Sequence, residues 1–153
     1  MTNVVEVAKA LLIAYNDKNW SSIKSMLAAG AVYDEKGTHR QIRGVGEIIH
    51  AWQDWAKTIP NSKATFVREF ASGDTAIFEI VWKGVHAGPL QTPTGNIPAS
   101  RGLIELPACE IVQVEAGKVK PHVERTFPLG AAAEALSLVE QGHLAGKIVL
   151  VVN

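Results

Sequence analysis

The chain has 153 residues, 47% of them hydrophobic, and its formal net charge at neutral pH is zero. This length fits one domain with a core that needs no disulfide or structural metal. The basic residues do not cluster in one segment, which argues against nucleic-acid binding, and no apolar run approaches the roughly 20 residues of a membrane helix.

Cysteine usage and the N-terminus indicate the compartment. The single cysteine, Cys109, cannot form an internal disulfide, which fits a reducing environment. No basic segment followed by an apolar one, as in a secretory signal, precedes the first apolar pattern. We therefore expect a soluble cytoplasmic protein.

The first half of the chain has the apolar spacing of helices. Apolar residues recur every three or four positions from Val4 to Tyr15, and Ser21 or Ser22 is placed to cap a second, short helix. The stretch "AVYDEKGTHRQIRG" predicts a short strand and then a polar loop. A third helix follows in "GVGEIIHAWQDWAKTI" and ends before Pro60.

The second half changes to the period of two that is typical of strands. "KATFVREFAS" and "TAIFEIVWKGVHAG" alternate on either side of a Gly73-Asp74 turn, and "GPLQTPTGNIPASRG" predicts an irregular loop. "GLIELPACEIVQVEAGKVKPHVERTF" predicts two more strands, joined at Glu115–Gly117. Helices followed by an antiparallel meander predict an α+β fold, with the helices packed on one face of a curved sheet.

Four stretches follow the order and spacing of one known family. They are "AYNDKNW", "IRGVGEIIHAWQDW", "SGDTAIFEIVWKGVHAGPL" and "IPASRGLIELPACEIVQVEAGKV". Residues from about 5 to 127 thus resemble the SnoaL-like polyketide cyclase branch of the NTF2-like superfamily. The resemblance implies a cone-shaped barrel, usually dimeric, around an apolar cavity. It also implies cofactor-independent proton transfer on a hydrophobic cyclic ketone or polyketide, while relatives isomerise ketosteroids or open epoxides.

The tail resembles a different family. "RTFPLGAAAEALSLVEQGHLAGKIVLVV" is similar to the C-terminus of zinc-independent quinone oxidoreductases of the medium-chain dehydrogenase type. We expect an NTF2-like domain over 1–128, and over 129–153 an extension made of a helix, 129–142, and a strand, 147–152. This extension would pack on the same domain or on a partner subunit. No nicotinamide cofactor is expected, because "GVGEII" lacks the preceding strand and the third glycine of a dinucleotide site.

The family resemblance places a catalytic acid near the end of the last barrel strand, where this chain has Phe127. Phenylalanine cannot transfer a proton. Two readings stay open: an enzyme whose acid lies elsewhere, or a ligand-binding or assembly module that has lost its reaction.

Two pairs of residues are candidate acids and bases. His122 and Glu124 share one face of the last strand, although that face is also placed to meet solvent. Asp34 and His39 flank the loop after the first strand. They are either a base and a hydrogen-bond donor of the site, or a turn aspartate and a solvated histidine without a catalytic role.

Other residues are candidates for substrate binding. Arg125 lies on the apolar face of the last strand, where it would either contact substrate or form a salt bridge with Glu110 across the turn. His86 lies in "GVHAGPL", which is similar to the family's GTH-x-GPL stretch, and the resemblance implies that it supports the backbone or lies at the rim of the cavity. The tryptophans either fill the core or stack on a flat ligand. The predicted binding residues are Tyr33, Trp52, Trp55, His86, Glu110, Arg125 and Phe127.

The expected partners are a hydrophobic small molecule and a second copy of the chain, with no nucleic acid and no membrane. A metal is not expected, because the sequence has neither a His-x-x-x-His spacing nor paired cysteines.

Overall fold

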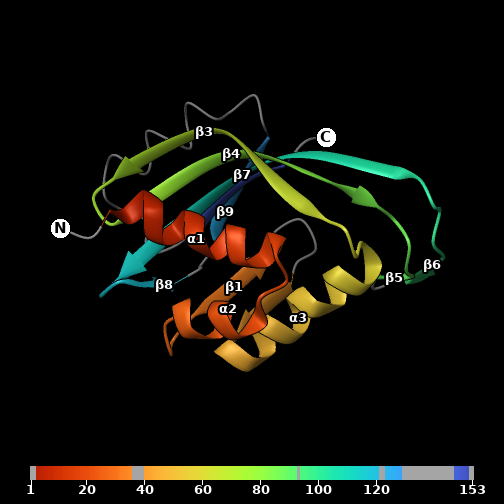
Figure 1. Cartoon of the computed structure of the whole chain (residues 1–153), viewed down its shortest axis with the longest axis horizontal. Helices are drawn as coiled ribbons and strands as arrows, with labels where there is room; N and C mark the ends of the chain where they lie inside the picture. The colour runs from red at the N-terminus through yellow and green to blue at the C-terminus, as the bar shows by residue number, and fades with distance from the viewer. Residues whose placement is uncertain (1–2, 36–39, 93, 121–122, 129–146, 152–153) are drawn as a thin grey trace.

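A computed structural model describes residues 3–35, 40–92, 94–120, 123–128 and 147–151; side chains are described in these ranges except for Asp34 and the last two ranges. Three helices of this part lie together on one side of a curved sheet (Figure 1). They are α1 (Val4–Asn16), α2 (Trp20–Met26) and α3 (Val45–Thr58). Helices on one face of a mainly antiparallel sheet make an α+β architecture, as the sequence predicts.

The main sheet has six strands, in the order β3-β4-β7-β10-β9, with β8 paired to β7 beside β10. Two separate hairpins, β1–β2 and β5–β6, complete the described strands. Their bounds are β1 (Val32–Glu35), β2 (Arg40–Arg43), β3 (Lys63–Ser72), β4 (Thr75–Val85), β5 (Leu90–Thr92), β6 (Gly95–Ile97), β7 (Leu103–Glu115), β8 (Lys118–Lys120), β9 (Val123–Pro128) and β10 (Lys147–Val151).

Helix α1 begins at a side-chain cap and buries one apolar face. The side-chain oxygen of Asn3 accepts hydrogen bonds from the backbone of Val5 and Glu6, which satisfies amides that have no partner within the helix. The buried face carries residues at helical spacing: Ala8, Leu11, Leu12 and Tyr15. Burial of one such leucine stabilises the fold by roughly 1.5–3 kcal/mol.

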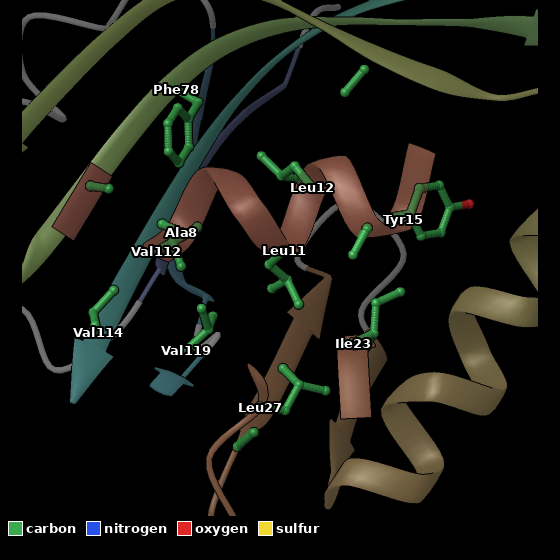
Figure 2. Close-up of a cluster of buried hydrophobic side chains, with 14 of the residues drawn as sticks. Ala8, Leu11, Leu12, Tyr15, Ile23, Leu27, Phe78, Val112, Val114 and Val119 are labelled. Atoms are coloured by element: carbon green, nitrogen blue, oxygen red, sulfur yellow. The ribbon is translucent and has the colours of Figure 1, made fainter. Parts of the chain in front are cut away.

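The core lies between α1 and the long strands β4 and β7. Phe78 and Val112 point from these strands toward α1, and Ile23 and Leu27 close the cluster from below in Figure 2. Phe78 and Ile23 are fully buried, so their packing fixes the distance between helices and sheet.

One face of β4 and β7 carries this core, and we call its residues the inner row. Residues directly opposite each other in an antiparallel pair point to the same face. Their pairing therefore defines the inner row as Ala76, Phe78, Ile80 and Trp82 on β4 with Val112, Glu110, Ala108 and Leu106 on β7. The row is apolar except for Glu110.

The end of α1 is attached to the sheet through one side-chain amide. Asn16 accepts a hydrogen bond from the backbone N–H of Ala64 at 2.7 Å and donates one to the carbonyl of Ala64 at 2.9 Å. Both bonds use backbone groups of β3, so the C-terminal turn of α1 is fixed against the sheet edge.

The structure differs from the sequence analysis in three short segments. Arg40–Arg43 is a strand rather than a loop, because pairing with β1 stabilises a stretch with only one apolar residue, Ile42. The expected irregular loop after β4 contains the β5–β6 hairpin. Helix α2 is capped by Asn19, not by Ser21 or Ser22.

The last strands are also arranged differently. The chain turns at Glu115–Gly117 and pairs with β7 as expected, but only over β8. Strand β10 then lies between β7 and β9, pairing antiparallel with β7 and parallel with β9. Glu110 and Arg125 are therefore not cross-strand neighbours. The helix expected at 129–142 lies outside the described residues.

None of the helices in the described ranges has the length and apolarity needed to cross a membrane.

Packing of the segment after β4 against the end of α3 generates a test. A Cβ atom at Gly88 would lie 2.3 Å from the carbonyl oxygen of Lys57 and 3.2 Å from the Cα of Thr58. Gly88→Ala must therefore move backbone, and we expect it to lower the free energy of unfolding by about 1–3 kcal/mol in urea titrations. Gly46→Ala, on α3 with nothing within 4 Å of the new Cβ, is the matched control and should raise it by about 0.5–1 kcal/mol. Equal stability of the two variants would contradict this packing.

Candidate active site

A largely shielded carboxylate, Glu35, organises the hairpin β1–β2 and its contact with α3. The hydroxyl of Tyr33, two residues before it on the same face of β1, donates a hydrogen bond to Glu35 Oε1 at 2.6 Å. The indole Nε1 of Trp55 on α3 donates to the same oxygen at 3.0 Å. Arg40, directly opposite on β2, contacts Oε2 through Nε at 3.0 Å and Nη2 at 2.9 Å.

These donors decide the charge of Glu35. Burial alone would raise the pKa of this carboxyl, whose side chain is only 12% exposed. Hydrogen bonds from Tyr33, Arg40 and Trp55, with the positive charge of Arg40, outweigh burial and lower the pKa below its usual value. Glu35 is therefore an anion at neutral pH.

The same contact keeps Tyr33 neutral. Burial raises the pKa of this phenol well above its usual value, and the negative charge of Glu35 raises it further. Tyr33 thus remains a hydrogen-bond donor throughout the physiological pH range.

Five aromatic side chains form a cluster between the helices and the sheet. Tyr15, at the end of α1, makes edge-to-face contacts with Trp20, Trp52 and Trp82 at ring-centroid distances of 5.9, 6.3 and 5.3 Å. Trp52 makes another with Tyr33 at 5.6 Å. These are favoured geometries for aromatic pairs, so the cluster joins α1, α2, α3, β1 and β4.

The hydroxyl of Tyr15 lies beside Ser62 and Lys18. Its oxygen is 3.4 Å from Ser62 Oγ, which also lies 3.4 Å from Lys18 Nζ. Lys18 itself is held by bonds to the backbone carbonyls of Ser62 at 2.6 Å and Tyr15 at 3.2 Å, with its ammonium over the Tyr15 ring. Burial, and then the like charge of Lys63, lower the pKa of Lys18.

Glu110 brings a second carboxylate to this interior. It lies in the inner row of β7, opposite Phe78. Burial raises the pKa of Tyr15 and of Tyr33, and the negative charge of Glu110 adds to both shifts. The charge of Glu110 thus acts on the pKa of both tyrosines.

Some of the predicted binding residues come together. Tyr33, Trp52 and Trp55 meet around Glu35 or within the aromatic cluster, and the inner-row carboxylate Glu110 lies close enough to affect the tyrosines. The side chains of most other predicted site residues lie outside the described part of the chain. The side chain of Asp34 lies outside the description, as do His39, His122 and the side chains of Glu124, Arg125 and Phe127.

His86 lies apart from this group, just beyond the end of β4. Its Nδ1 accepts a hydrogen bond from the backbone N–H of Ser100 at 3.2 Å, which assigns the proton of the neutral ring to Nε2. The backbone of His86 also bonds to Gly102 and Arg101. His86 therefore holds the 100–102 loop, a backbone-supporting position of the kind that the sequence resemblance implies.

Sequence reasoning missed Glu35, Arg40, Ser62 and Lys18. The signal for Glu35 was present, because Tyr33 and Glu35 share a strand face by their spacing of two. Its donor Trp55 is 20 residues away in the sequence, and its donor Arg40 lies across a hairpin that the sequence analysis did not predict. No local sequence pattern therefore indicated that these side chains meet at Glu35.

The described residues contain no group of three or more His, Cys, Asp or Glu side chains placed to hold a metal ion.

Comparison with solved structures places the architecture. IdmH from Streptomyces antibioticus superposes with a TM-score of 0.66, at 18% identity, over 78% of this chain and 88% of that one. A protein with a ketosteroid isomerase-like fold from Catenulispora acidiphila gives 0.62, at 17% identity, over 75% and 80%. An LEH-like epoxide hydrolase from M. tuberculosis gives 0.59, at 15% identity, over 76% and 77%. These likenesses confirm the NTF2-like, ketosteroid isomerase-like fold.

The tail matches a different group over short stretches. Residues 109–150 match a zinc-binding dehydrogenase family. The mitochondrial NAD(P)H oxidoreductase RTN4IP1 of Bos taurus is 51% identical over 37 residues, 24% of this chain, and the Homo sapiens protein is 39% identical over 69 residues, 45% of this chain. The matched stretches span only 9% and 15% of those proteins.

Most of the chain matches one family. The SnoaL-like polyketide cyclases match residues 5–125, which include all three helices and both carboxylates, Glu35 and Glu110. The chain therefore belongs to the SnoaL-like polyketide cyclase family.

Proposed function

We propose that the chain is a cofactor-independent cyclase or isomerase that transfers a proton on a hydrophobic cyclic ketone or polyketide. The observation that carries this proposal is Glu110, a carboxylate in an otherwise apolar row of β7 whose negative charge raises the pKa of both Tyr15 and Tyr33. Family membership and the aromatic cluster support a flat, apolar substrate stacked beside Trp52 and Trp82.

The two half-buried carboxylates, Glu35 and Glu110, have different proposed roles. Glu35 is held as an anion by strong donors, and a low pKa makes a carboxylate a poor base at neutral pH. It therefore positions Tyr33 and Trp55. Glu110 is the general base, which removes a proton from the carbon next to the substrate carbonyl.

Tyr15 is the proposed donor to the oxygen that becomes negative in this step. Because its pKa is raised, the phenol keeps its proton and can donate a hydrogen bond to the enolate oxygen. In an isomerisation, Glu110 then returns the proton to another carbon of the substrate. In a cyclisation, the enolate carbon attacks a second carbonyl, and Glu110 protonates the new alkoxide.

Lys18 and Ser62 set the direction of the Tyr15 hydrogen bond. An ammonium has only donors, so Ser62 Oγ accepts from Lys18. In the proposed arrangement the Ser62 hydroxyl donates to the Tyr15 oxygen, which leaves the Tyr15 proton for the substrate; Ser62 lowers the pKa of Tyr15, as a donor to its oxygen would.

The first prediction concerns the base and the donor. Glu110→Gln should lower kcat by about 10²–10⁴ and Tyr15→Phe by about 10²–10³, with the Kd of a polycyclic ketone, measured by tryptophan fluorescence, changed little. Asp34→Asn and Glu124→Gln are the comparison variants at the other candidate acids. A large loss of kcat in either of them, with Glu110→Gln fully active, would move the base. Binding of the ketones without turnover by the unmodified chain would support a binding module instead.

The second prediction tests the hydrogen-bond direction. Ser62→Ala removes Oγ but leaves the backbone carbonyl that holds Lys18, so Lys18 stays in place. We expect kcat to fall about tenfold, the effect of one hydrogen bond of about 1.4 kcal/mol, and the spectrophotometric pKa of Tyr15 to rise, because Ser62 lowers it. Unchanged titration of Tyr15 in Ser62→Ala would show that no such bond exists.

The third prediction follows from the ionised state of Glu35. Since its folded pKa is lowered, its contribution to stability is present above the unfolded pKa of about 4.3 and is lost as the pH falls through the folded pKa. Glu35→Gln should cost roughly 1.5–3 kcal/mol of unfolding free energy at pH 7, and the difference from the unmodified chain should shrink below about pH 4.3.

The control for Glu35→Gln is Glu105→Gln, whose partner Lys83 lies at 3.2 Å in an exposed pair. That variant should change stability by less than about 1 kcal/mol at any pH. A Glu35→Gln effect that stays constant down to acid pH would mean that Glu35 is not held as an anion.

A further inference from the structure

The edge of β7 next to β8 has a defined register. Strands β7 and β8 pair Glu115 with Lys118, Val114 with Val119 and Gln113 with Lys120. Moving one residue toward the N-terminus of β7 therefore moves its partner one residue toward the C-terminus of the chain. If this pairing continued, Val123 would lie opposite Glu110 and Glu124 opposite Cys109.

The structure places another strand at these positions. Val149 pairs with Glu110, and Leu150 with Cys109, so β10 occupies the place that the hairpin register gives to residues 123–124. Strand β9 pairs with the far edge of β10, with Thr126 beside Val149 and Phe127 beside Leu150. Two segments of the chain, β10 and residues 123–127, could therefore pair with the same edge of β7.

We propose that the edge of β7 at Cys109 and Glu110 is a strand-exchange site: β10 occupies it in the structure described here, and residues 123–127 take it when β10 leaves. Pairing to an edge uses backbone groups, which any extended segment can supply. The competing segment follows β8, which already holds this register, and its pairing would resume after Pro121, which has no backbone N–H to donate. The two family matches overlap over residues 109–125, so this edge and the competing segment fit both families.

Exchange would also change which positions face the interior. Val119 is fully buried and lies opposite Val114, so the continued register would place positions 123 and 125 in the same inward row. Position 125 would then lie opposite Ala108, next to Glu110. In the structure, the register with β10 puts Thr126 level with Val149 and Glu110, and Arg125 takes the alternate position.

This change has a consequence for the proposed base, and that consequence alone rests on the proposed function. An arginine beside a carboxylate stabilises its charged form and makes it a weaker base. Exchange would place position 125 next to Glu110 in the inward row and would therefore inhibit proton transfer.

The native cysteine makes the site testable by cross-linking in the full chain. Cys109 is the only cysteine in the sequence. Directly opposed residues of antiparallel strands have Cα atoms about 4.5–5.5 Å apart, within the range that a disulfide spans. Leu150→Cys should therefore form a disulfide with Cys109 within one molecule after mild oxidation, detected by peptide mapping. A disulfide only between two molecules, or none, would overturn the assignment of β10 to this edge.

Exchange is tested with Glu124→Cys. It should cross-link poorly to Cys109 in the full chain, and at least several-fold more when Val149→Pro is added, because proline does not fit a central strand. Phe127→Cys in the same Val149→Pro chain is the matched control, since the continued register puts position 127 opposite Leu106, away from Cys109. Equal cross-linking of Glu124→Cys with and without Val149→Pro, or none in either, would refute the exchange.

A second measurement covers the case in which Val149→Pro unfolds the protein. The single variant Glu124→Cys, in urea below the global unfolding transition, should cross-link increasingly as β10 detaches, and a flat response up to the transition would refute exchange. All these results are covalent bonds, independent of activity. An inactive protein with the expected cross-links would therefore reject the proposed enzyme and retain the exchange site.

Discussion

The packing of α1 against the inner row is the contact on which the rest of the site depends. Ala8, Leu11 and Leu12 are buried against the row, and Phe78 fills the space between strand and helix. The same helix ends in Tyr15 and Asn16, so the apolar contact fixes the height and direction of the phenol. The Asn16 bonds to Ala64 then prevent the last turn from unwinding. A proton donor that must meet a substrate within a fraction of an ångström needs such a support.

The two carboxylates Glu35 and Glu110 have different electrostatic surroundings. A buried anion is costly unless donors surround it, and Glu35 meets this condition with a phenol, an indole and a guanidinium. Those donors are thereby fixed in place, which ties β1, β2 and α3 together. Glu110 lies on the rigid central strand β7 among apolar neighbours. One carboxylate thus ties β1, β2 and α3 together, while the other is the proposed base on β7.

The helices and the long strands were predictable because their patterns repeat. The apolar spacing from Val4 to Tyr15 and the alternation in β4 each carry one period over ten or more residues, and the structure keeps both. The short strand β2 has one apolar residue and exists through its pairing with β1, so no local pattern predicts it. The Glu35 site was hidden for a similar reason, since Trp55 is 20 residues away and meets Glu35 only after α3 has packed.

The position of β10 shows the limit of sequence patterns most clearly. An apolar run predicts a strand over 147–152, and residues 147–151 form one, but the run says nothing about which edge the strand joins. A strand edge selects partners by backbone hydrogen bonding and register, and both β10 and the continuation of β8 satisfy those conditions along β7. A segment that matches part of a dehydrogenase family therefore joins this sheet through β10. The contact is made through backbone groups, and the proposed catalytic residues Glu110 and Tyr15 lie within the range that matches the SnoaL-like family. What the added strand can change is the neighbour of Glu110, and so the electrostatic setting of the proposed base.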